Sequence, residues 1–348
     1  MKLDTKTAAA LLSFSAVLIC LFALGCPRTD KDGDDKLLAF SATGELLPRA
    51  GSTVLFRGEE SALAEVAPLL QERDLVHADL AGALEFGCQP LGRDEVYKWR
   101  PEWLDYLSAA NIRVINLADD HALDCGREAL HKSARFLMAE GFYYAGAGST
   151  QKEAQTPVYI TVNNITVSIL SFLLERPPGI EPCPACSGPS LYKRQALISG
   201  LREMKDRSDF RIVVLHYQEK DLPSLSAEEL RITRAAIDFG ADLVLGYGAR
   251  SAGGLHRLRG KWAITGMGTF TGKAVDNPEK TADGFVLCAE FRRNTISNLR
   301  LMPVRLDEGR PSPVRGDEGR AVLENLVRVS GPDVRANSKI TKDILYLK

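Results

Sequence analysis

The chain has 348 residues, 45% of them hydrophobic and 26% charged, with 44 basic against 45 acidic side chains. This composition excludes a disordered chain, a collagen-like chain and a small disulfide-dense protein, because there is enough apolar material to build a large core. The net charge of −1 argues against a nucleic-acid binder, which normally carries a basic excess, so no nucleic-acid partner is expected.

The N-terminus has the layout of a secretory signal. Lys2 and Lys6 precede an apolar run from Ala8 to Leu24, and a small residue follows before Cys26. Residues 21–26 resemble a bacterial lipobox, which implies that Cys26 is diacylated and becomes the mature N-terminus. We therefore expect residues 1–26 to be a lipoprotein signal peptide; an uncleaved membrane anchor and ordinary secretion are the alternatives. Two acyl chains hold a protein stably at a membrane, so we expect an extracytoplasmic protein anchored in a bacterial cell envelope.

Three further regions follow the signal. Residues 27–36 are polar and charged, which predicts a tether between the lipid and a folded domain. Residues 37–291 alternate short β-branched runs with longer amphipathic segments, which predicts one layered domain. Residues 292–348 carry 12 basic and 7 acidic side chains, which indicates a basic C-terminal extension; a solvated surface or a surface for anions would both explain this charge.

Strands and helices alternate along the central region. The expected strands are Leu37–Ala42, Thr53–Phe56, Ile112–Leu117, Val158–Val162, Ile165–Phe172, Arg211–His216, Leu243–Gly246, Trp262–Thr265 and Phe285–Phe291. The expected helices are Glu59–Glu72, Pro101–Ala110, Gly126–Glu140, Gln195–Arg207 and Ala227–Phe239. A hairpin pattern around Asn163 and Asn164 adds an antiparallel pair. The sequence therefore predicts the α/β class, as a layered sandwich with mixed β-sheets.

One cysteine pair stands close together in the sequence. Cys183 and Cys186 lie in a proline-rich stretch that is typical of a loop, not of the strand-to-helix corner of a thioredoxin-type redox motif. A second CxxC, which a four-cysteine zinc site would need, is absent from the sequence. We expect a structural disulfide between Cys183 and Cys186; unpaired thiols and a metal or redox role are the alternatives.

Acidic and histidine residues recur just after the expected strands. They are Glu45, Asp79, the run Asp119-Asp120-His121, His216, and Arg250 in a glycine-rich stretch. No single segment can surround a metal ion, so a metal-assisted hydrolase needs such groups delivered from several strand ends onto one edge. This pattern points to a metal or anion site at that edge of the sheet.

The order and the local residue sequences of these segments resemble those of the CapA family. Its members are poly-gamma-glutamate capsule synthesis proteins with a calcineurin-like metallophosphoesterase fold. The resemblance covers roughly residues 37–291. It is carried by Gly44-Glu45, Asp79-Leu80-Ala81-Gly82, Leu117-Ala118-Asp119-Asp120-His121, His216-Tyr217-Gln218, Ala241-Asp242-Leu243-Val244-Leu245-Gly246 and Gly268-Thr269-Phe270. The resemblance implies a metallophosphoesterase-like fold and a role in the cell envelope.

Several family positions are changed. Glu45 stands for the family's aspartate and Ala81 for its glutamate, the asparagine pair is Asp119 and Asp120, and the late histidines are absent near Gly248 and Arg250. The resemblance leaves Glu45, Asp79, Asp120 and His216 as candidate metal ligands, enough for one divalent ion such as Mn, Fe or Zn. His121 is the candidate proton donor. Arg250 is a candidate for binding carboxylate or phosphate where positive charge has been lost.

Three functions remain open from the sequence. The first is a CapA-like lipoprotein in the synthesis, export or anchoring of an anionic envelope polymer, with a weakened metal site. The second is an active metal-dependent hydrolase of phosphoester or glutamyl linkages, so catalysis is undecided. The third is a pseudoenzyme or binding module. The expected partners are the membrane, an anionic polymer or glycan, and envelope biosynthesis proteins.

Overall fold

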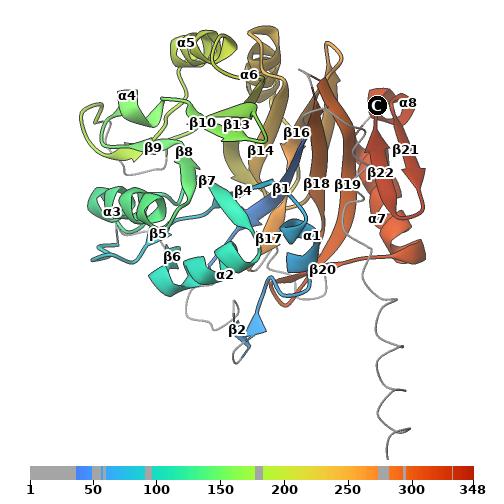
Figure 1. Ribbon diagram of the computed structural model, residues 1–348, viewed down its shortest axis with the longest axis horizontal. Coiled ribbons are helices and arrows are strands. Elements are labelled where there is room, and N and C mark those ends of the chain that lie inside the picture. The colour runs from blue at the N-terminus through green and yellow to red at the C-terminus, as the bar shows by residue number, and fades with distance from the viewer. Residues whose placement is uncertain are drawn as a thin grey trace, which may run out of the picture.

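Two β-sheets stacked face to face, with helices on their outer sides, form the protein (Figure 1). This computed structural model describes residues 37–48, 56–57, 60–90, 96–176, 183–272, 282–292, 295–330 and 332–348. The expected signal peptide with Cys26, the tether at 27–36 and residues 53–55 of the strand expected at Thr53–Phe56 lie outside the described residues.

The larger sheet is mixed and has ten strands. They are β1 (Leu38–Leu46), β4 (Leu75–Leu80), β7 (Ile112–Asn116), β8 (Tyr143–Ala145), β17 (Thr269–Thr271), β18 (Ala282–Arg292), β19 (Thr295–Asp307), β20 (Arg310–Pro313), β21 (Ser338–Thr341) and β22 (Ile344–Leu347). Eight of them follow the order β21-β22-β19-β18-β1-β4-β7-β8, while β17 pairs with β1 and β20 with β19. Neighbours from β1 to β8 are parallel, whereas β18 is antiparallel to both β1 and β19.

The smaller sheet has six strands in the order β10-β11-β13-β14-β16-β15 and is also mixed. They are β10 (Val158–Val162), β11 (Ile165–Leu173), β13 (Phe210–Lys220), β14 (Leu243–Ala249), β15 (Gly253–Leu258) and β16 (Lys261–Gly266). The expected hairpin joins β10 to β11, and both asparagines of its turn have positive φ angles, 53° and 59°. Short two-stranded sheets are made by β2 (Phe56–Arg57) with β3 (Glu60–Ser61), β5 (Ala83–Leu84) with β6 (Lys98–Trp99), and β9 (Ala147–Gly148) with β12 (Gly188–Pro189).

Helices cover the outer faces of both sheets and, near the C-terminus, contact the edge strands of both sheets. They are α1 (Ala67–Gln71), the 3-10 turn Pro101–Trp103, α2 (Leu104–Ala109), α3 (Arg127–Ala139), α4 (Gln151–Ala154), α5 (Arg194–Lys205), α6 (Ala227–Asp238), α7 (Gly316–Val329) and α8 (Pro332–Ala336). Helix α6 begins with a capping box, in which Ser226 and Glu229 exchange side-chain and backbone hydrogen bonds. None of the helices in the described ranges is long and apolar enough to cross a membrane.

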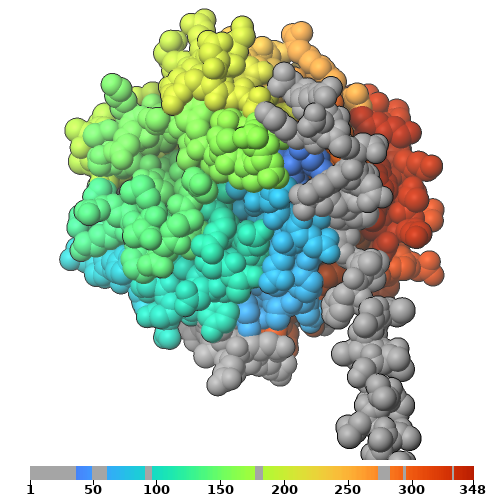
Figure 2. All heavy atoms as spheres, viewed as in Figure 1, coloured from blue at the N-terminus to red at the C-terminus, as the bar shows by residue number. Residues whose placement is uncertain are grey.

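Three apolar layers explain the stacking. Between the sheets, Phe291 of β18 stacks on Phe40 of β1 and on Phe210 of β13, with ring centroids 5.2 Å and 4.5 Å apart. A second layer packs the larger sheet against α1, α2 and α3, and a third packs the smaller sheet against α5 and α6. In Figure 2 the blue β1 region is visible only over a small area, in agreement with the burial of all nine of its residues. The expected α/β sandwich with mixed sheets is confirmed.

Two differences from the expected elements have local causes. The helix expected at Glu59–Glu72 is wrong: Glu60 and Ser61 form a strand, a turn follows, and only Ala67–Gln71 is α-helical. Pro68 lies in the first turn of this helix, because proline lacks the amide hydrogen that a longer helix would need there. The strand β4 was not expected, since polar His77 and Asp79 interrupt its apolar pattern, yet all six of its residues are buried.

The C-terminal residues continue the larger sheet. Strand β19 pairs with β18 over ten positions and in turn with β22, while Leu323 and Leu326 of α7 enter the apolar layer between the sheets. The expected boundary after Phe291 therefore falls inside the β18–β19 hairpin.

Candidate metal centre

Residues from both sheets meet at the carboxyl ends of the parallel strands. On the larger sheet, Glu45 of β1 pairs with Asp79 of β4, and Asp79 pairs with Asn116 of β7, so the three stand in one row. A register shift between Ala42 and Glu45 precedes this row, and such bulges commonly re-aim a side chain. His216 comes from β13 of the smaller sheet. Ligand sites of α/β sheets commonly lie at this end of the strands.

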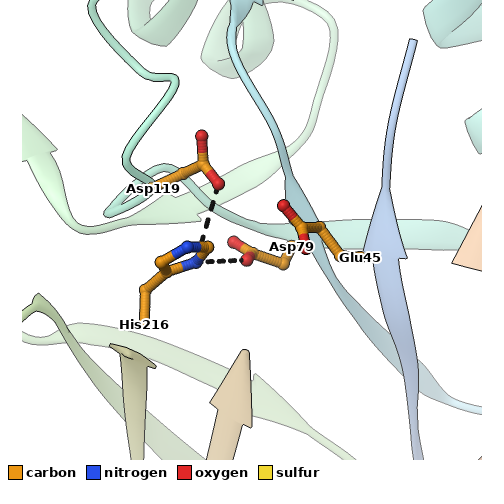
Figure 3. Close-up of side chains that lie close together, drawn as sticks. All are labelled: Glu45, Asp79, Asp119 and His216. Atoms are coloured by element: carbon orange, nitrogen blue, oxygen red, sulfur yellow. Dashed lines mark hydrogen bonds and ion pairs between the residues drawn. The ribbon is translucent and has the colours of Figure 1, made fainter. Parts of the chain in front are cut away.

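Four buried side chains form the innermost group, which we call the buried cluster: Glu45, Asp79, Asp119 and His216 (Figure 3). Each offers one ligand atom, and these atoms lie within 4.8 Å of one another. The Nδ1 atom of His216 is 2.9 Å from Oδ2 of Asp79 and 3.5 Å from Oδ2 of Asp119. Asp79 also accepts a hydrogen bond from the amide of Asn116.

Asp119 is held by the backbone. Its Oδ1 atom accepts hydrogen bonds from the N–H groups of Gly82 at 3.1 Å and His121 at 2.7 Å. Gly82 has a φ of +90°, and a Cβ atom there would lie 2.2 Å from the carbonyl oxygen of Tyr97, so this position requires glycine. The Oδ2 atom of Asp119 is buried and has no hydrogen-bond partner among the described residues. A buried acceptor left without a donor is a place where a cation fits.

Burial and mutual repulsion disturb the titration of this cluster. Burial raises the pKa of Glu45 to about 8, and it raises the pKa values of Asp79 and Asp119 as well. Burial disfavours the charged form of His216, but the carboxylates of Asp119 and Asp79 outweigh this and raise its pKa well above the ordinary value. Three acidic groups therefore compete for one imidazolium, and a further positive charge would stabilise their ionised forms.

A second group lies beside the first, closer to solvent. We call Asp120, His121 and Glu219 the rim group. The Oδ1 atom of Asp120 is 3.1 Å from Nε2 of His216, so this histidine connects the two groups. Nδ1 of His121 is 2.7 Å from Oδ2 of Asp124. Burial lowers the pKa of His121, but the hydrogen bond to Asp124 and the nearby charge of Asp120 raise it overall.

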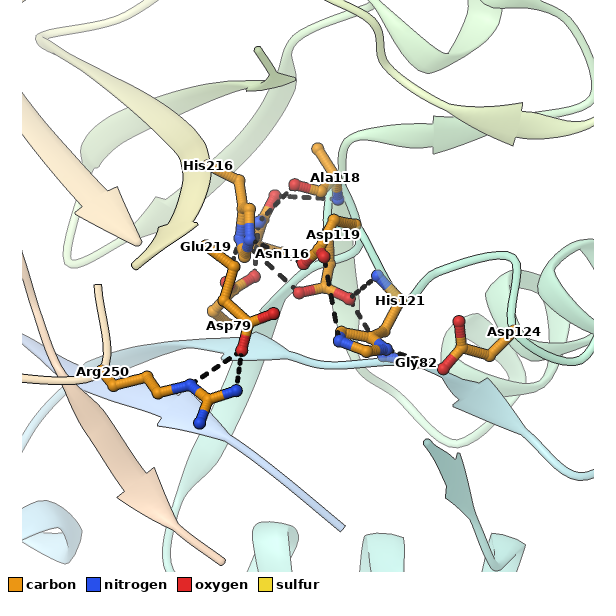
Figure 4. Close-up of polar contacts among 11 residues, drawn as sticks. Asp79, Gly82, Asn116, Ala118, Asp119, His121, Asp124, His216, Glu219 and Arg250 are labelled. Carbon is orange, nitrogen blue, oxygen red and sulfur yellow. Dashed lines mark hydrogen bonds and ion pairs between the residues drawn. The ribbon is translucent and has the colours of Figure 1, made fainter. Parts of the chain in front are cut away.

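The rim group already has a cation of its own. Arg250 donates from Nε to Oε1 of Glu219 at 2.8 Å and makes a second bond from Nη2 to the same oxygen (Figure 4). Its side chain is 27% exposed and that of Glu219 is 37% exposed. Arg250 thus lies next to the site as expected, with its guanidinium engaged by a carboxylate of the same chain; its role in binding a ligand anion stays a prediction.

Residues near the places of the absent histidines shape the site. Tyr247 is buried, and its hydroxyl donates to the carbonyl of Thr43 at 3.1 Å and lies 3.0 Å from Nδ1 of His77. Gly248 has a φ of +93°, and a Cβ atom there would lie 2.5 Å from the carbonyl oxygen of Tyr217. A histidine could not be restored at position 248 without moving the backbone.

The structure brings the expected ligands together with one change. Glu45, Asp79 and His216 meet in the buried cluster, but their fourth member is Asp119, whereas Asp120 lies in the rim group with His121. The sequence marked both acids; which of them turns inward depends on the loop after β7. Glu219 was missed because β13 was expected to end at His216, while it continues to Lys220.

Cys183 and Cys186 form a disulfide, and a second bond that we did not expect joins Cys88 to Cys125. Cys26, the expected lipidation site, is outside the described residues.

The donor set of the buried cluster suits a divalent metal ion. Three carboxylates and one imidazole are ligands that Mn, Fe and Zn accept in proteins, and four such groups match one tetrahedral ion. The Oδ2 atom of Asp119, which has no hydrogen bond among the described residues, and the raised carboxyl pKa values both agree with this. The cluster could therefore hold a metal ion, and it lies at the strand ends of a layered α/β protein.

Comparison with known proteins identifies the family. The model of the family described as "Bacterial capsule synthesis protein PGA_cap" matches residues 39–273, and the chain belongs to this family. The chain is 20% identical to the "PGA biosynthesis protein CapA" of Bacillus subtilis (strain 168) over 294 residues, which are 83% of this chain and 77% of that protein. It is 22% identical to the "Capsule biosynthesis protein CapA" of Bacillus anthracis over 278 residues, 78% of this chain and 66% of that one. The resemblance to the CapA family is thus confirmed.

Solved structures with a similar fold are more distant. A hypothetical protein from Thermus thermophilus matches with a TM-score of 0.50 and 14% identity, over 77% of this chain and 99% of that one. The calcineurin-like phosphoesterase YfkN from Bacillus subtilis matches with a TM-score of 0.41 and 12% identity, over 81% of this chain and 89% of that one. At such identities the likeness concerns the fold alone.

Proposed function

We propose that this protein acts in the synthesis, export or anchoring of an anionic capsule polymer of the poly-gamma-glutamate type, and that its buried cluster binds one divalent metal ion. Membership of the capsule synthesis family and the names of the two CapA relatives support the first part. The observation that carries the second part is the convergence of Glu45, Asp79, Asp119 and His216 from both sheets.

One ion suits the site better than two. A dinuclear centre holds its ions about 3.5–4 Å apart and needs several ligands for each. The residues that would serve a second ion are Asp120, His121 and Glu219, but Glu219 is bound to Arg250 and His121 to Asp124. Ala81 and Gly248 contribute no ligand side chain at two family positions. A mononuclear centre is therefore part of the proposal, with Mn, Fe or Zn as the ion.

A bound ion would supply an attractive positive charge for anionic groups and would lower the pKa of its water toward about 7. The protein residues would hold this charge in place: Asn116 orients Asp79, and the N–H groups of Gly82 and His121 orient Asp119. Such supporting bonds keep ligands in one arrangement and tune their basicity.

The metal proposal is tested with the full-length protein after treatment with EDTA. Titration with Mn²⁺ by calorimetry is expected to give one ion per chain. Asp119→Asn keeps the shape of the side chain and removes its charge. Loss of a group that only orients a metal ligand lowers metal affinity by about 10–100-fold, so loss of a ligand's charge should lower the affinity for Mn²⁺ by at least that much. Glu219→Gln removes the same charge from the rim and serves as the control, with little change expected. Two tightly bound ions, or an Asp119→Asn variant with wild-type affinity, would contradict the proposal.

The polymer role is tested in the source bacterium. A strain without this protein should carry less cell-bound anionic polymer, and complementation with Asp119→Asn should restore less of it than the wild type does. Unchanged polymer in the deletion strain would overturn the assigned process, whatever the metal content.

We also propose that Cys26 anchors the protein by lipid on the extracytoplasmic side of the membrane. The apolar run to Leu24, the small Gly25 and Cys26 itself support this. Cys26→Ser should abolish labelling by radioactive palmitate and move the protein out of the fraction of lipid-anchored proteins. Labelling that persists in this variant would contradict lipidation at Cys26.

A hydrolase is the second candidate, and the His121–Asp124 pair favours it. An imidazole that a carboxylate orients, with a raised pKa and beside the buried cluster, has the features of a general acid. Hydrolysis of a chromogenic phosphodiester or of a γ-linked glutamate oligomer, measured with Mn²⁺, should then fall by about 10²–10⁴-fold in His121→Gln. Metal affinity should stay the same. Turnover that does not depend on His121 would remove this candidate.

A further inference from the structure

A cavity at the opposite end of the sheets carries an inference about a second binding site. It has a volume of about 330 Å³ and lies where β13 and β14 begin, next to the β15–β16 hairpin and the C-terminal residues. The buried cluster lies beyond the other end of these strands. Phe210 and His216 are six positions apart on β13, so the two places are separated by roughly 20 Å at about 3.3 Å per residue.

The wall of the cavity combines cations with buried apolar surface. Arg257 and Lys261 contribute positive charge, and Phe210, Trp262 and Leu347 are apolar residues that are at most 7% exposed. Asp242 also lines the cavity, but its carboxylate is shared by Lys261 at 2.7 Å and Arg211 at 3.1 Å. The negative charge of Asp242 is thus already balanced by Lys261 and Arg211.

Arg257 is the unusual member of this group. It is half-buried, its guanidinium lies 5.6 Å from the ring centroid of Trp262, and its Nη1 atom is buried without a hydrogen-bond partner. Other arginines on this molecule, such as Arg250, Arg259 and Arg305, are bound to carboxylates. Within the described residues the guanidinium of Arg257 has no carboxylate at ion-pair distance, although desolvated charges are normally paired.

We propose that this cavity binds a carboxylate group of the anionic capsule polymer, with Arg257 as its principal contact. A guanidinium presents parallel N–H donors that match the two oxygens of a carboxylate. The apolar surface of Trp262 and Leu347 suits the methylene groups that separate successive carboxylates in a γ-linked glutamate chain. The identity of the ligand rests on the proposed function; the existence of an anion site rests on the unpaired Arg257 alone.

A site at this end would give the protein two separate points of contact with one polymer. The buried cluster attracts anions through a bound ion, whereas Arg257 needs none. The cavity should therefore bind γ-linked glutamate even when metal has been removed. This independence from metal separates the two sites experimentally.

The test uses the full-length protein in EDTA and a γ-linked glutamate oligomer of defined length, with binding measured by calorimetry. Arg257→Gln is expected to weaken binding at least about 10-fold, the loss typical for a charge-assisted hydrogen bond. Arg259→Gln is the matched control, since Arg259 is two residues away, 76% exposed at its side chain and bound to Asp238. The affinity of Arg259→Gln for the oligomer should remain at the wild-type value. Equal affinity of Arg257→Gln and wild type would overturn the proposal.

Further variants and a second ligand test the remaining explanations. Arg257→Lys keeps the charge but loses the paired donors, so intermediate affinity is expected. If Arg257→Gln does not fold, the Arg257→Lys variant carries the test, and wild-type affinity in that variant would overturn the site. Binding of inorganic phosphate without binding of the oligomer would overturn the polymer carboxylate as the ligand. The cavity site would also be overturned if Asp119→Asn lost oligomer binding while Arg257→Gln kept the wild-type affinity. Failure of the Mn²⁺ titration would count only against the metal proposal.

Discussion

The buried cluster and the rim group contain similar residue types and lie at the same strand ends, but their charges are balanced differently. In the rim group, Glu219 is bound to Arg250, and His121 is bound to Asp124. In the buried cluster three carboxylates share only His216, and Oδ2 of Asp119 has no hydrogen-bond partner among the described residues. The rim group is also partly exposed, so water screens its charges, whereas the cluster is closed to solvent.

This contrast indicates where a cation belongs. A set of charges that is balanced within the chain gains little from an added ion, while an unbalanced buried set gains much, because interactions are stronger where water is excluded. The family's late histidines are replaced on the rim side, where Arg250 now brings a permanent positive charge to Glu219. The contrast thus supports one ion in the cluster and none at the rim, and four experiments test it.

The largest effect is expected from His216, the residue that connects the two groups. His216→Ala leaves three buried acidic groups without their counter-charge, so the metal-free protein should lose about 3–5 kcal/mol of unfolding free energy at a pH where they are ionised. His121→Ala at the rim removes one hydrogen-bond partner and should cost less, about 1–3 kcal/mol. Urea denaturation of the EDTA-treated proteins measures both. Equal losses for the two variants would mean that the cluster is not the more strained of the two groups.

The Cys88–Cys125 disulfide should affect the rim and leave the cluster intact. Cys125 follows Asp124, whose carboxylate holds His121 and the N–H of Tyr97 at 2.8 Å. Replacing both cysteines by alanine opens a loop with a sequence separation of 37 and should cost about 2–4 kcal/mol. The Mn²⁺ affinity should not change. Replacing Cys183 and Cys186 is the control with a separation of 3, where the loss should be smaller. A loss of Mn²⁺ binding with the Cys88–Cys125 bond would show that the two groups are coupled.

Metal addition should stabilise the folded protein through the cluster. At a free metal concentration one hundred times the Kd, a single site adds about 2.7 kcal/mol to the unfolding free energy. Thermal unfolding with Mn²⁺ and with EDTA measures this gain, which should vanish in Asp119→Asn and persist in Glu219→Gln. Stabilisation that depends on Glu219 instead would place the ion at the rim.

The smallest effect is expected from Arg250. Its ion pair with Glu219 is partly exposed, so Arg250→Gln should change the unfolding free energy by less than about 1 kcal/mol. The same titration with Mn²⁺ should still give one ion. A second ion that binds tightly in this variant would show that Arg250 alone keeps the rim from holding metal.

Much of the architecture followed from local patterns in the sequence. The β-branched runs at 112–116, 158–162 and 165–173 and the apolar periodicity of α3, α5 and α6 agree with their expected places to within a few residues. These elements are long or strongly patterned, and the pattern depends only on neighbouring residues. The strand β4 escaped this reasoning because its polar residues face a site instead of solvent.

The chemistry of the site was likewise only partly readable. Glu45, Asp79 and His216 stood out as polar residues at strand ends, and the order of the motifs was enough to indicate the capsule synthesis family. Asp119 and Asp120 could not be ranked from sequence, since they are adjacent and chemically identical. Their roles separate only because the N–H groups of Gly82 and His121 turn Asp119 inward.

Residue types, much of the secondary-structure pattern and the resemblance to the family were thus readable from the amino-acid sequence. Which charges are paired became clear only from the folded chain: Arg250 with Glu219, His121 with Asp124, and Arg257 with no carboxylate among the described residues. Periodicity is a property of neighbouring residues, whereas the pairing of a charge depends on sheet register between segments far apart in the chain. Arg250 and Glu219, for example, are 31 positions apart and meet only because β13 and β14 lie side by side.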